Sequence, residues 1–282
     1  YPPLGSLSII TALKKAGYHD VEFYNIDYLR PKYADAVAHI KARKPDILGI
    51  SAVVSTAYEY SKKLSLDIKE ALPDTTILLG GNLGASADIL LKKTGVDFVC
   101  TGEGELTIVD FVSCWVDAQS RNDFKQVKGL AYLDNDQSLV VTPFPEAVKP
   151  DQVYDIDWSI LDKLGETEFF ISTFEGANPT FRKRIEKIPR ALEYINLGKR
   201  CVTIVASKGC VARCTFCHRW DKGIRYIPVT AMMERIDSLI QNYNVGFISF
   251  ADENFGTDRK WLAHFIQEIK KRDIHWQVGG MR

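Results

Sequence analysis

The sequence predicts an α/β fold with parallel sheets, divided between two domains. Strand patterns alternate with helical patterns over the first 115 residues, and the alternation resumes after residue 200. The helical stretches are long enough to be crossovers between parallel strands. With 282 residues, of which 46% are hydrophobic, the chain can bury two separate cores.

In the amino-terminal part, helices and strands take turns in a regular order. Apolar residues at helical or alternating spacing, bounded by glycine and proline, define these segments. We expect helices at 4–18, 33–44, 57–73, 86–95 and 106–118, and strands at 20–27, 45–53, 75–82 and 96–105. The strands at 75–82 and 96–105 end in glycines, which allow tight turns and a close approach of a ligand to the backbone.

The second part begins after a segment of different character. Residues 128–143 have the pattern of a β-hairpin, and residues 143–165 carry prolines without sustained periodicity. We therefore expect a first domain at 1–118, a hairpin and linker at 119–170, and a second domain at 171–282. Strands are expected at 201–210, 245–255 and 275–282, with helices at 228–244 and 258–272, so that ligands would gather at the carboxyl ends of the strands.

Composition excludes several classes of protein. The 36 basic and 36 acidic side chains balance, which argues against a nucleic-acid or membrane surface as partner. We find no apolar run of spanning length and no signal peptide, so we expect cytoplasmic localisation and reduced thiols. The start at Tyr1, without methionine, and the end in a strand-like segment lead us to expect a fold truncated at both ends, a piece of a longer protein.

Half of the six cysteines lie within eight residues, at Cys210, Cys214 and Cys217. Thiolates that converge in a short loop usually hold a metal. Zinc would need a fourth ligand, and His218 directly after Cys217 is awkwardly placed to supply it. An iron–sulfur cluster with three thiolates keeps one iron open for a substrate. A zinc staple and a redox thiol turn remain the alternatives.

The stretch "CVARCTFC" resembles the Cys-x3-Cys-x-aromatic-Cys motif of the radical S-adenosylmethionine (SAM) enzymes. The resemblance implies a partial (βα) barrel in which the three cysteines bind a [4Fe-4S] cluster that reductively cleaves SAM to a 5′-deoxyadenosyl radical. Phe216 would pack near the adenine. An electron donor such as flavodoxin or ferredoxin would then be a partner.

The stretch "ADENF" ends the second strand of this part, where the family holds the ammonium group of SAM. Asp252 and Glu253 are the nearest equivalents of the Gly-Gly-Glu motif, which is absent, and "DENF" resembles the form found in cobalamin-dependent members. The alternative is an acidic turn that caps the next helix. Arg225 matches a basic position that often follows the cysteine loop, although exposed arginines are common.

The first part resembles the cobalamin-binding domain that precedes many radical SAM barrels, a Rossmann-like parallel-sheet domain. "PPLG", "ILGISAV", "ILLGGN" and "VDFVCTGEGE" follow one another in the family's order. The resemblance implies that the nucleotide tail of cobalamin would be lined by Ser51, Gly80, Gly81, Gly102, Glu103, Gly104 and Glu105. The family's first strand and the Asp-x-His-x-x-Gly motif are missing, so cobalamin would lack a histidine ligand; His19 and His39 are expected to be solvated.

The resemblance implies a cobalamin-dependent enzyme, most often a methyltransferase that acts on an unactivated carbon of a small-molecule or peptide substrate. A cyclase, oxidase or rearrangement enzyme with the same cofactors is the enzymatic alternative. A cobalamin- or metal-binding module without turnover is the alternative from another class. No paired carboxylates, catalytic triad or phosphate loop competes for the chemistry.

Overall fold

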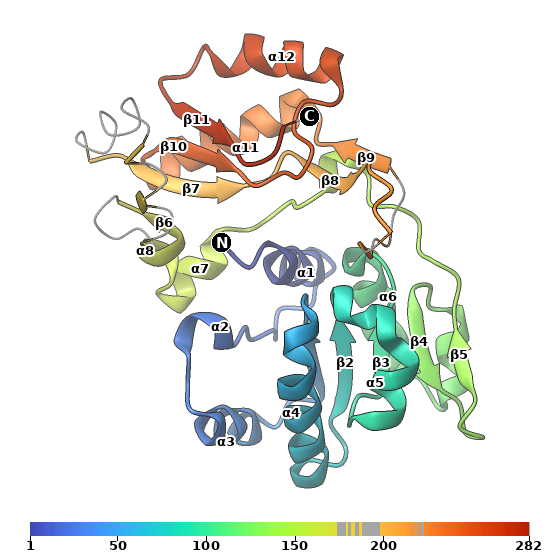
Figure 1. Ribbon diagram of the computed structural model, residues 1–282. Coiled ribbons are helices and arrows are strands. Elements are labelled where there is room, and N and C mark those ends of the chain that lie inside the picture. The colour runs from blue at the N-terminus through green and yellow to red at the C-terminus, as the bar shows by residue number, and fades with distance from the viewer. Residues whose placement is uncertain are drawn as a thin grey trace. The chain divides into compact units, whose positions relative to one another are not determined.

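A computed structural model describes residues 1–173, 179, 182–183, 186–187, 198–215, 217–218, 220 and 223–281. The contacts between residues divide the chain into two compact units. One unit comprises residues 1–8, 149–214 and 222–282, and the other comprises residues 9–148 and 215–221. Each unit is built around a sheet of its own, as expected for an α/β fold (Figure 1).

The unit that contains residues 9–148 is built on a five-stranded sheet in the order β1-β2-β3-β4-β5. Its first three strands are parallel: β1 (Ile47–Ser51), β2 (Thr76–Gly80) and β3 (Phe98–Cys100). The expected hairpin forms, as β4 (Leu130–Leu133) and β5 (Leu139–Val141), and it extends this sheet in the antiparallel direction. The hairpin is therefore part of this unit.

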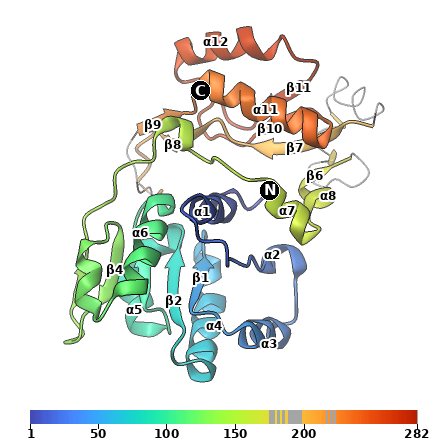
Figure 2. The same cartoon turned by 180° about the vertical axis from the view of Figure 1, so that it is seen from behind.

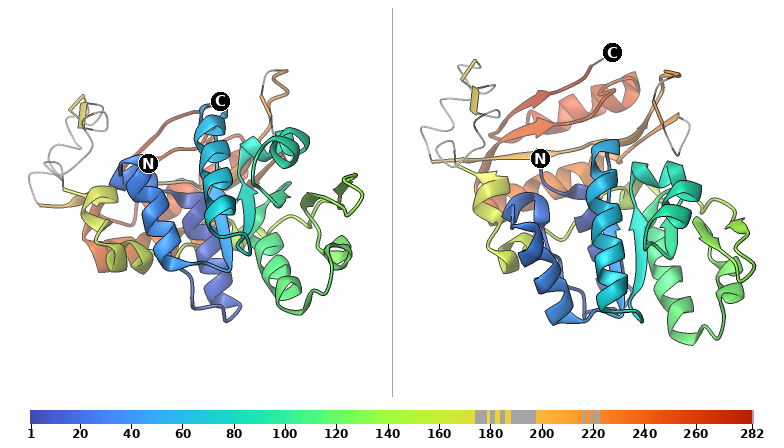
Figure 3. Two further views of the ribbon diagram at one scale, coloured as in Figure 1. Left: turned by 90° about the horizontal axis from the view of Figure 1, so that it is seen from below. Right: turned by 60° about the horizontal axis from the view of Figure 1, so that its bottom comes forward.

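Helices cover both faces of this sheet (Figures 1 and 2). Successive residues of β2 point to opposite faces, so Ile77 and Leu79 pack with α3, α4 and α5, whereas Leu78 packs with α1 and α6. The helices are α1 (Leu4–Lys15), α2 (Ile26–Leu29), α3 (Tyr33–Arg43), α4 (Tyr58–Ala71), α5 (Ala87–Lys93) and α6 (Gly104–Asp117), with short turns η1 (Ser55–Ala57), η2 (Asn82–Ser86) and η3 (Arg121–Gln126). Figure 3 shows the length of α4 beside the strands.

The other unit holds a four-stranded sheet in the order β11-β10-β7-β6. Three of its strands are parallel, namely β7 (Arg200–Ile204), β10 (Val245–Phe250) and β11 (His275–Val278), while β6 (Ile171–Ser172) runs antiparallel. The crossover helices α11 (Val229–Tyr243) and α12 (Arg259–Ile269) share one core with β7 and β10. Strands that lie side by side in chain order with crossover helices are the pattern of a (βα) barrel, and the described residues form an open sheet rather than a closed barrel.

The remaining elements of this unit are short. They are η4 (Pro150–Gln152), α7 (Ser159–Leu164), α8 (Thr167–Phe170) and the two-stranded ribbon of β8 (Ser207–Cys210) and β9 (Gly223–Tyr226). The segment expected as a linker after the hairpin thus contains two short helices, α7 and α8, and the 3-10 turn η4. Among the residues that the structure describes, none of the helices combines the length and the apolar character needed to cross a membrane.

Two expectations about elements were wrong. Residues 20–25 form no strand, and α2 begins at Ile26. Among the described strands β1 pairs only with β2, so this segment does not add to the sheet, and an alternating pattern by itself does not specify a partner strand. The single strand expected at 201–210 is broken after Ile204, and its second half pairs with β9 instead of continuing along the sheet.

Candidate functional site

The carboxyl ends of β1, β2 and β3 bring together the residues expected to line a cobalamin tail. Ser51 is paired with Gly80 at the ends of β1 and β2, and Leu79 is paired with Val99 in β3. Because the three strands are parallel neighbours, the segments that follow them leave the sheet at one edge. Ser51 is exposed there, so its hydroxyl is free to meet a ligand from solvent.

Gly81 is the residue at this edge that only glycine can occupy. Its φ is +94°, and a Cβ at this position would lie 2.5 Å from the carbonyl oxygen of Ala52. The neighbouring main chain is tied by hydrogen bonds from Ala52 N to Gly80 O (2.9 Å) and from Leu83 N to Ala52 O (3.1 Å). The edge between β1 and β2 is therefore a surface of packed main chain without bulky side chains.

The turn from Gly102 to Glu105 joins β3 to α6 at the same edge. Gly102 has a φ of +134°, and α6 begins at Gly104, where a Cβ would lie 2.6 Å from Ile9. Glu103 is buried, and its Oε2 accepts a hydrogen bond from the backbone N–H of Val148 at 2.8 Å. The Glu103 carboxylate thus ties the end of the hairpin segment to the turn, and Glu105 is buried as well.

Two apolar side chains at this edge were not predicted from the sequence. Val53 and Val54, which directly follow β1, are 61% and 58% exposed. Val53 was interpreted only as the last residue of the strand at 45–53, and Val54 was assigned to no element. Because the strand ends at Ser51, these side chains lie in the loop that leads to η1 and are available for contact with an apolar ligand surface.

The cysteine motif begins at the end of the β8–β9 ribbon. Cys210 is paired with Gly223 and is half-buried, whereas Cys214 and Cys217 are exposed. Gly209, with a φ of +96°, lets β8 approach the carbonyl of Gly223. Phe216 lies outside the described residues.

The Cys210 sulfur receives two N–H donors. The backbone N–H of Ala212 lies 3.4 Å from Sγ, and the side-chain Nδ2 of Asn254 lies 3.2 Å from it. Such donors are what the thiolates of iron–sulfur clusters accept from their protein. Within the described part of the chain, no three His, Cys, Asp or Glu side chains already converge on one point. The donor set of three closely spaced thiols, two of them accessible, nevertheless fits a cluster.

The two acids after β10 lie in different environments. Asp252 is buried; its Oδ2 accepts from the backbone N–H of Ala206 at 2.8 Å, and its Oδ1 accepts from the Ser207 hydroxyl. Burial raises the pKa of Asp252 above its ordinary value, an effect that these two donors partly offset. Glu253 is exposed, and so it is the acid of this pair that a ligand can reach.

The strand β9 carries Arg225 opposite Lys208 of β8. Arg225 is half-buried, and this burial lowers the pKa of its guanidinium from the ordinary value because a charged group is poorly solvated there. The next residue, Tyr226, donates its hydroxyl to the carbonyl oxygen of Asn254 at 2.6 Å. Asn254 and Tyr226 were not predicted as site residues; the "DENF" string contained the signal for the first of them.

The two histidines of the amino-terminal part do not belong to the segments that directly follow β1, β2 and β3. His19 is exposed, and His39 on α3 pairs with Glu22 at 3.0 Å and stacks on Tyr24 with ring centroids 4.0 Å apart.

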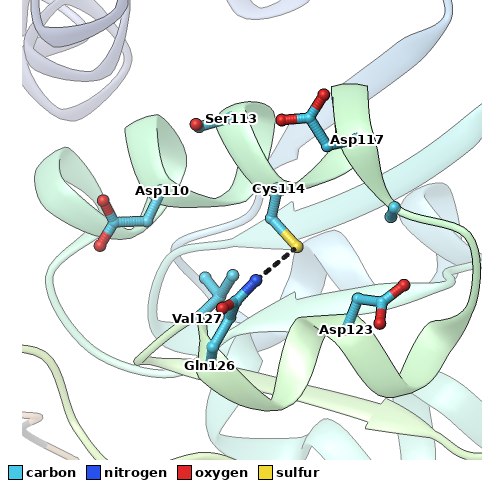
Figure 4. A pocket seen from close by; sticks show the side chains of 8 residues that line it. Asp110, Ser113, Cys114, Asp117, Asp123, Gln126 and Val127 are labelled. Carbon is cyan, nitrogen blue, oxygen red and sulfur yellow. Dashed lines mark hydrogen bonds between the residues drawn. The ribbon is translucent and has the colours of Figure 1, made fainter.

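A hollow between α6 and η3, drawn in Figure 4, is lined by Cys114 and by Asp110, Asp117 and Asp123. It contains none of the predicted site residues.

The amino-terminal part of the chain matches a known family of domains. Residues 1–112 match the family model described as the B12 binding domain. The amino-terminal part of this chain is thus similar to the B12 binding domain. The chain is 27% identical over 285 residues to the anaerobic magnesium-protoporphyrin IX monomethyl ester cyclase of Rubrivivax gelatinosus, covering 97% of this chain and 45% of that protein. It is 24% identical over 299 residues to the cytidylyl-2-hydroxyethylphosphonate methyltransferase of Streptomyces wedmorensis, covering 97% of this chain and 55% of that protein.

The fold also matches a solved structure. The cobalamin-dependent S-adenosylmethionine radical enzyme OxsB, with aqua-cobalamin and S-adenosylmethionine bound, superposes with a TM-score of 0.70 at 19% identity, covering 98% of this chain and 35% of that one. The predicted resemblance to radical SAM enzymes with a cobalamin-binding domain is thereby confirmed. The chain spans about half the length of the curated relatives that it matches.

Proposed function

We propose that this chain is part of a cobalamin-dependent radical SAM enzyme that transfers a methyl group to an unactivated carbon. The observation that carries the proposal is that one chain combines a match to the B12 binding domain with three cysteines within eight residues of sequence, the first of which ends β8. When bound, the [4Fe-4S] cluster supplies the electron that cleaves SAM to a 5′-deoxyadenosyl radical, and cobalamin supplies the methyl carrier.

The thiols of Cys210, Cys214 and Cys217 are proposed to bind the cluster. Two of them are exposed, so a cluster can be inserted from solvent, and the third is already fixed by two N–H donors. Three thiolates leave the fourth iron open for the amino and carboxylate groups of SAM. The short Cys-x3-Cys-x2-Cys spacing places all three thiols on one segment of eight residues, as a cluster with three protein ligands requires.

The SAM ammonium group is proposed to bind at the end of β10. Glu253 is exposed at this strand end and carries a charge opposite to that of the ammonium group. Asp252 uses both carboxylate oxygens within the protein, which favours a role in positioning the start of β8 over direct ligand contact. Phe216 beside the adenine and Arg225 as a basic contact complete the proposed SAM site.

The nucleotide tail of cobalamin is proposed to lie along the carboxyl edge of the first sheet. Gly80 and Gly81 present main chain there, Ser51 presents an exposed hydroxyl, and the Gly102–Glu105 turn borders them. Glu103 and Glu105 are buried, so their contribution is to shape the turn. The exposed Val53 and Val54 add an apolar surface beside this main chain.

A reaction without net methylation is the second candidate. Its support is the similarity to the cyclase of Rubrivivax gelatinosus, whose identity of 27% exceeds the 24% of the Streptomyces wedmorensis methyltransferase. The cofactors would be the same, and only the fate of the substrate radical would differ. A binding module without turnover is the rival from another class.

The experiment is turnover of the full-length, cofactor-loaded protein with methyl-labelled SAM under a reductant or with flavodoxin or ferredoxin as electron donor. Formation of 5′-deoxyadenosine together with a product heavier by one labelled CH₂ supports methyl transfer. Formation of 5′-deoxyadenosine with unlabelled product selects cyclisation, oxidation or rearrangement. If SAM remains intact with the cluster and cobalamin bound, the enzyme proposal is wrong and the binding module is favoured.

A further inference from the structure

The segment after β10, residues 251–257, is held rigidly by its own phenylalanine. Phe255 is fully buried and packs on Phe250 and Trp261, with ring centroids 5.2 Å and 5.5 Å away. Its backbone N–H donates to the carbonyl oxygen of Gly280 at 2.9 Å. The backbone beside Phe255, from which the neighbouring side chains extend, is therefore held in place.

This segment holds both strands of the β8–β9 ribbon at one end, where Ser207 is paired with Tyr226, and Cys210 lies at the other end. At the start of β8, Asp252 accepts from Ala206 N and from the Ser207 hydroxyl. At the end of β9, Tyr226 donates its hydroxyl to Asn254 O, and the same hydroxyl oxygen accepts from the backbone N–H of Thr257 at 3.0 Å. These hydrogen bonds fix the ribbon that carries Cys210.

The Asn254 side chain makes a further contact, with the Cys210 sulfur, which is separate from the hydrogen bonds that hold the ribbon. Its side chain is 4% exposed, and Nδ2 lies 3.2 Å from the Cys210 sulfur. Its Oδ1 is buried without a hydrogen-bond partner in the described structure. Buried acceptors are rarely left unpaired, so this amide is oriented toward the sulfur at the expense of its own oxygen. A metal-bound thiolate has no proton to donate, so only the N–H end of the amide suits it.

We propose that Asn254 is a positioning residue that donates an N–H hydrogen bond to the Cys210 thiolate and raises the reduction potential of the bound cluster. The inference rests on the proposed function, because it takes Cys210 as a cluster ligand. An N–H dipole stabilises negative charge on sulfur, and reduction adds negative charge to the cluster. The donor therefore favours the reduced form, from which the electron for SAM cleavage comes.

The test is the substitution Asn254→Leu, which keeps a similar side-chain volume and removes the donor. In full-length protein with the cluster loaded, an EPR-monitored redox titration should show the potential shifted to a more negative value. At a fixed potential the reduced-to-oxidised ratio should fall about tenfold, which corresponds to ~59 mV for a one-electron couple. Asn254→Gln, which retains the amide, should recover part of the shift.

Tyr226→Phe is the matched control. It removes a hydrogen bond to the same residue, at the main-chain oxygen of Asn254, but leaves the donor to sulfur in place. Its potential should equal that of the unchanged protein. An equal shift in Tyr226→Phe and Asn254→Leu would mean that the segment acts only as a scaffold and would overturn the inference.

Iron and sulfide analysis separates this inference from the proposed function. If the unchanged protein binds no cluster, the proposed function fails. If it binds a cluster whose potential is the same in Asn254→Leu, only the role of Asn254 fails. Should Asn254→Leu not assemble a cluster, the unchanged protein labelled with ¹⁵N-asparagine decides: pulsed EPR of the reduced cluster should detect a ¹⁵N coupling, and its absence contradicts the hydrogen bond.

Discussion

The two candidate ligand regions are built from different parts of the polypeptide. At the carboxyl edge of the first sheet, glycines and main-chain atoms form the surface, with Gly81 packed against Ala52. At the β8–β9 ribbon, the candidate site is made of side chains, namely three thiols, a buried Asp252 and a buried Asn254. The first region fits a ligand bound by shape, and the second fits one held by specific donor atoms.

This difference predicts which substitutions each region tolerates. A surface of main chain is disturbed when a side chain is added, whereas a site of donor atoms is disturbed when one atom is exchanged. Adding a methyl group at the sheet edge and replacing one sulfur by oxygen at the ribbon are therefore the two informative changes.

The substitution Cys214→Ser should abolish cleavage of SAM. Serine keeps the shape of cysteine but is a poor ligand for iron, so the cluster should be lost or become labile. The measurement is 5′-deoxyadenosine formed by the full-length reconstituted protein. Cys114→Ser on α6, a half-exposed cysteine outside the motif, is the matched control and should retain turnover. Equal activity in both variants would exclude the ribbon as the cluster site.

The substitution Gly81→Ala should destabilise the first unit by about 2–4 kcal/mol, because strain at positive φ and a close contact add together. The new Cβ would lie 2.5 Å from Ala52 O. Urea denaturation measures the stability, and corrinoid content measures the ligand.

Gly49→Ala in β1 is the control for Gly81→Ala. No atom lies within 4 Å of a Cβ at Gly49, so the change should stay within ~1 kcal/mol of the unchanged protein and retain corrinoid. If both variants lose the same stability, the close packing at the sheet edge is not what makes Gly81 necessary.

The substitution Glu253→Gln should weaken SAM binding about tenfold, the usual scale of one hydrogen bond to a charged group. Glu253 is exposed, so protein stability should not change. The KM for SAM in the cleavage reaction measures the effect. Glu234→Gln, an exposed carboxylate on α11, should leave this KM unchanged. An unaltered KM in Glu253→Gln would assign the ammonium contact to another group.

The substitution Asp252→Asn should change how stability depends on pH. Burial raises the pKa of Asp252 in the folded protein, so the folded state keeps this proton at pH values where the unfolded chain has lost it. The stability contributed by this group is thus present below about pH 3.9, the ordinary pKa, and falls as pH rises toward the folded pKa. Urea midpoints from pH 4 upward should show this fall in the unchanged protein and not in Asp252→Asn.

The spacing of apolar residues correctly predicted helices and strands that have a regular buried face. The helix at 57–73 appears as α4, and the first six residues of the strand expected at 245–255 appear as β10, because a buried face is encoded in the spacing of apolar residues. Asp258 was expected near the start of its helix and caps α12, accepting from Lys260 N and Trp261 N. Residues 20–25 failed because alternation does not reveal whether a partner strand exists.

The cysteine motif could be found in the sequence, and its surroundings could not. The thiols lie within eight residues, but Asn254, which contacts the Cys210 sulfur, lies 44 residues further along the chain. Tyr226 of the ribbon donates to a carbonyl oxygen 28 residues further along the chain. Likewise, "DENF" showed two acids, and only the fold reveals that Asp252 is buried while Glu253 is exposed. Hydrogen bonds between distant segments depend on sheet register, which a single sequence does not specify.

The most direct measurement is the iron, sulfide, zinc and corrinoid content of the full-length protein purified anaerobically. We expect about four iron and four sulfide per chain with corrinoid present, as a [4Fe-4S] cluster requires. Iron and sulfide should be lost, and corrinoid retained, when Cys210, Cys214 and Cys217 are all changed to alanine. Stoichiometric zinc without sulfide would contradict the account and make the cysteine ribbon a structural staple.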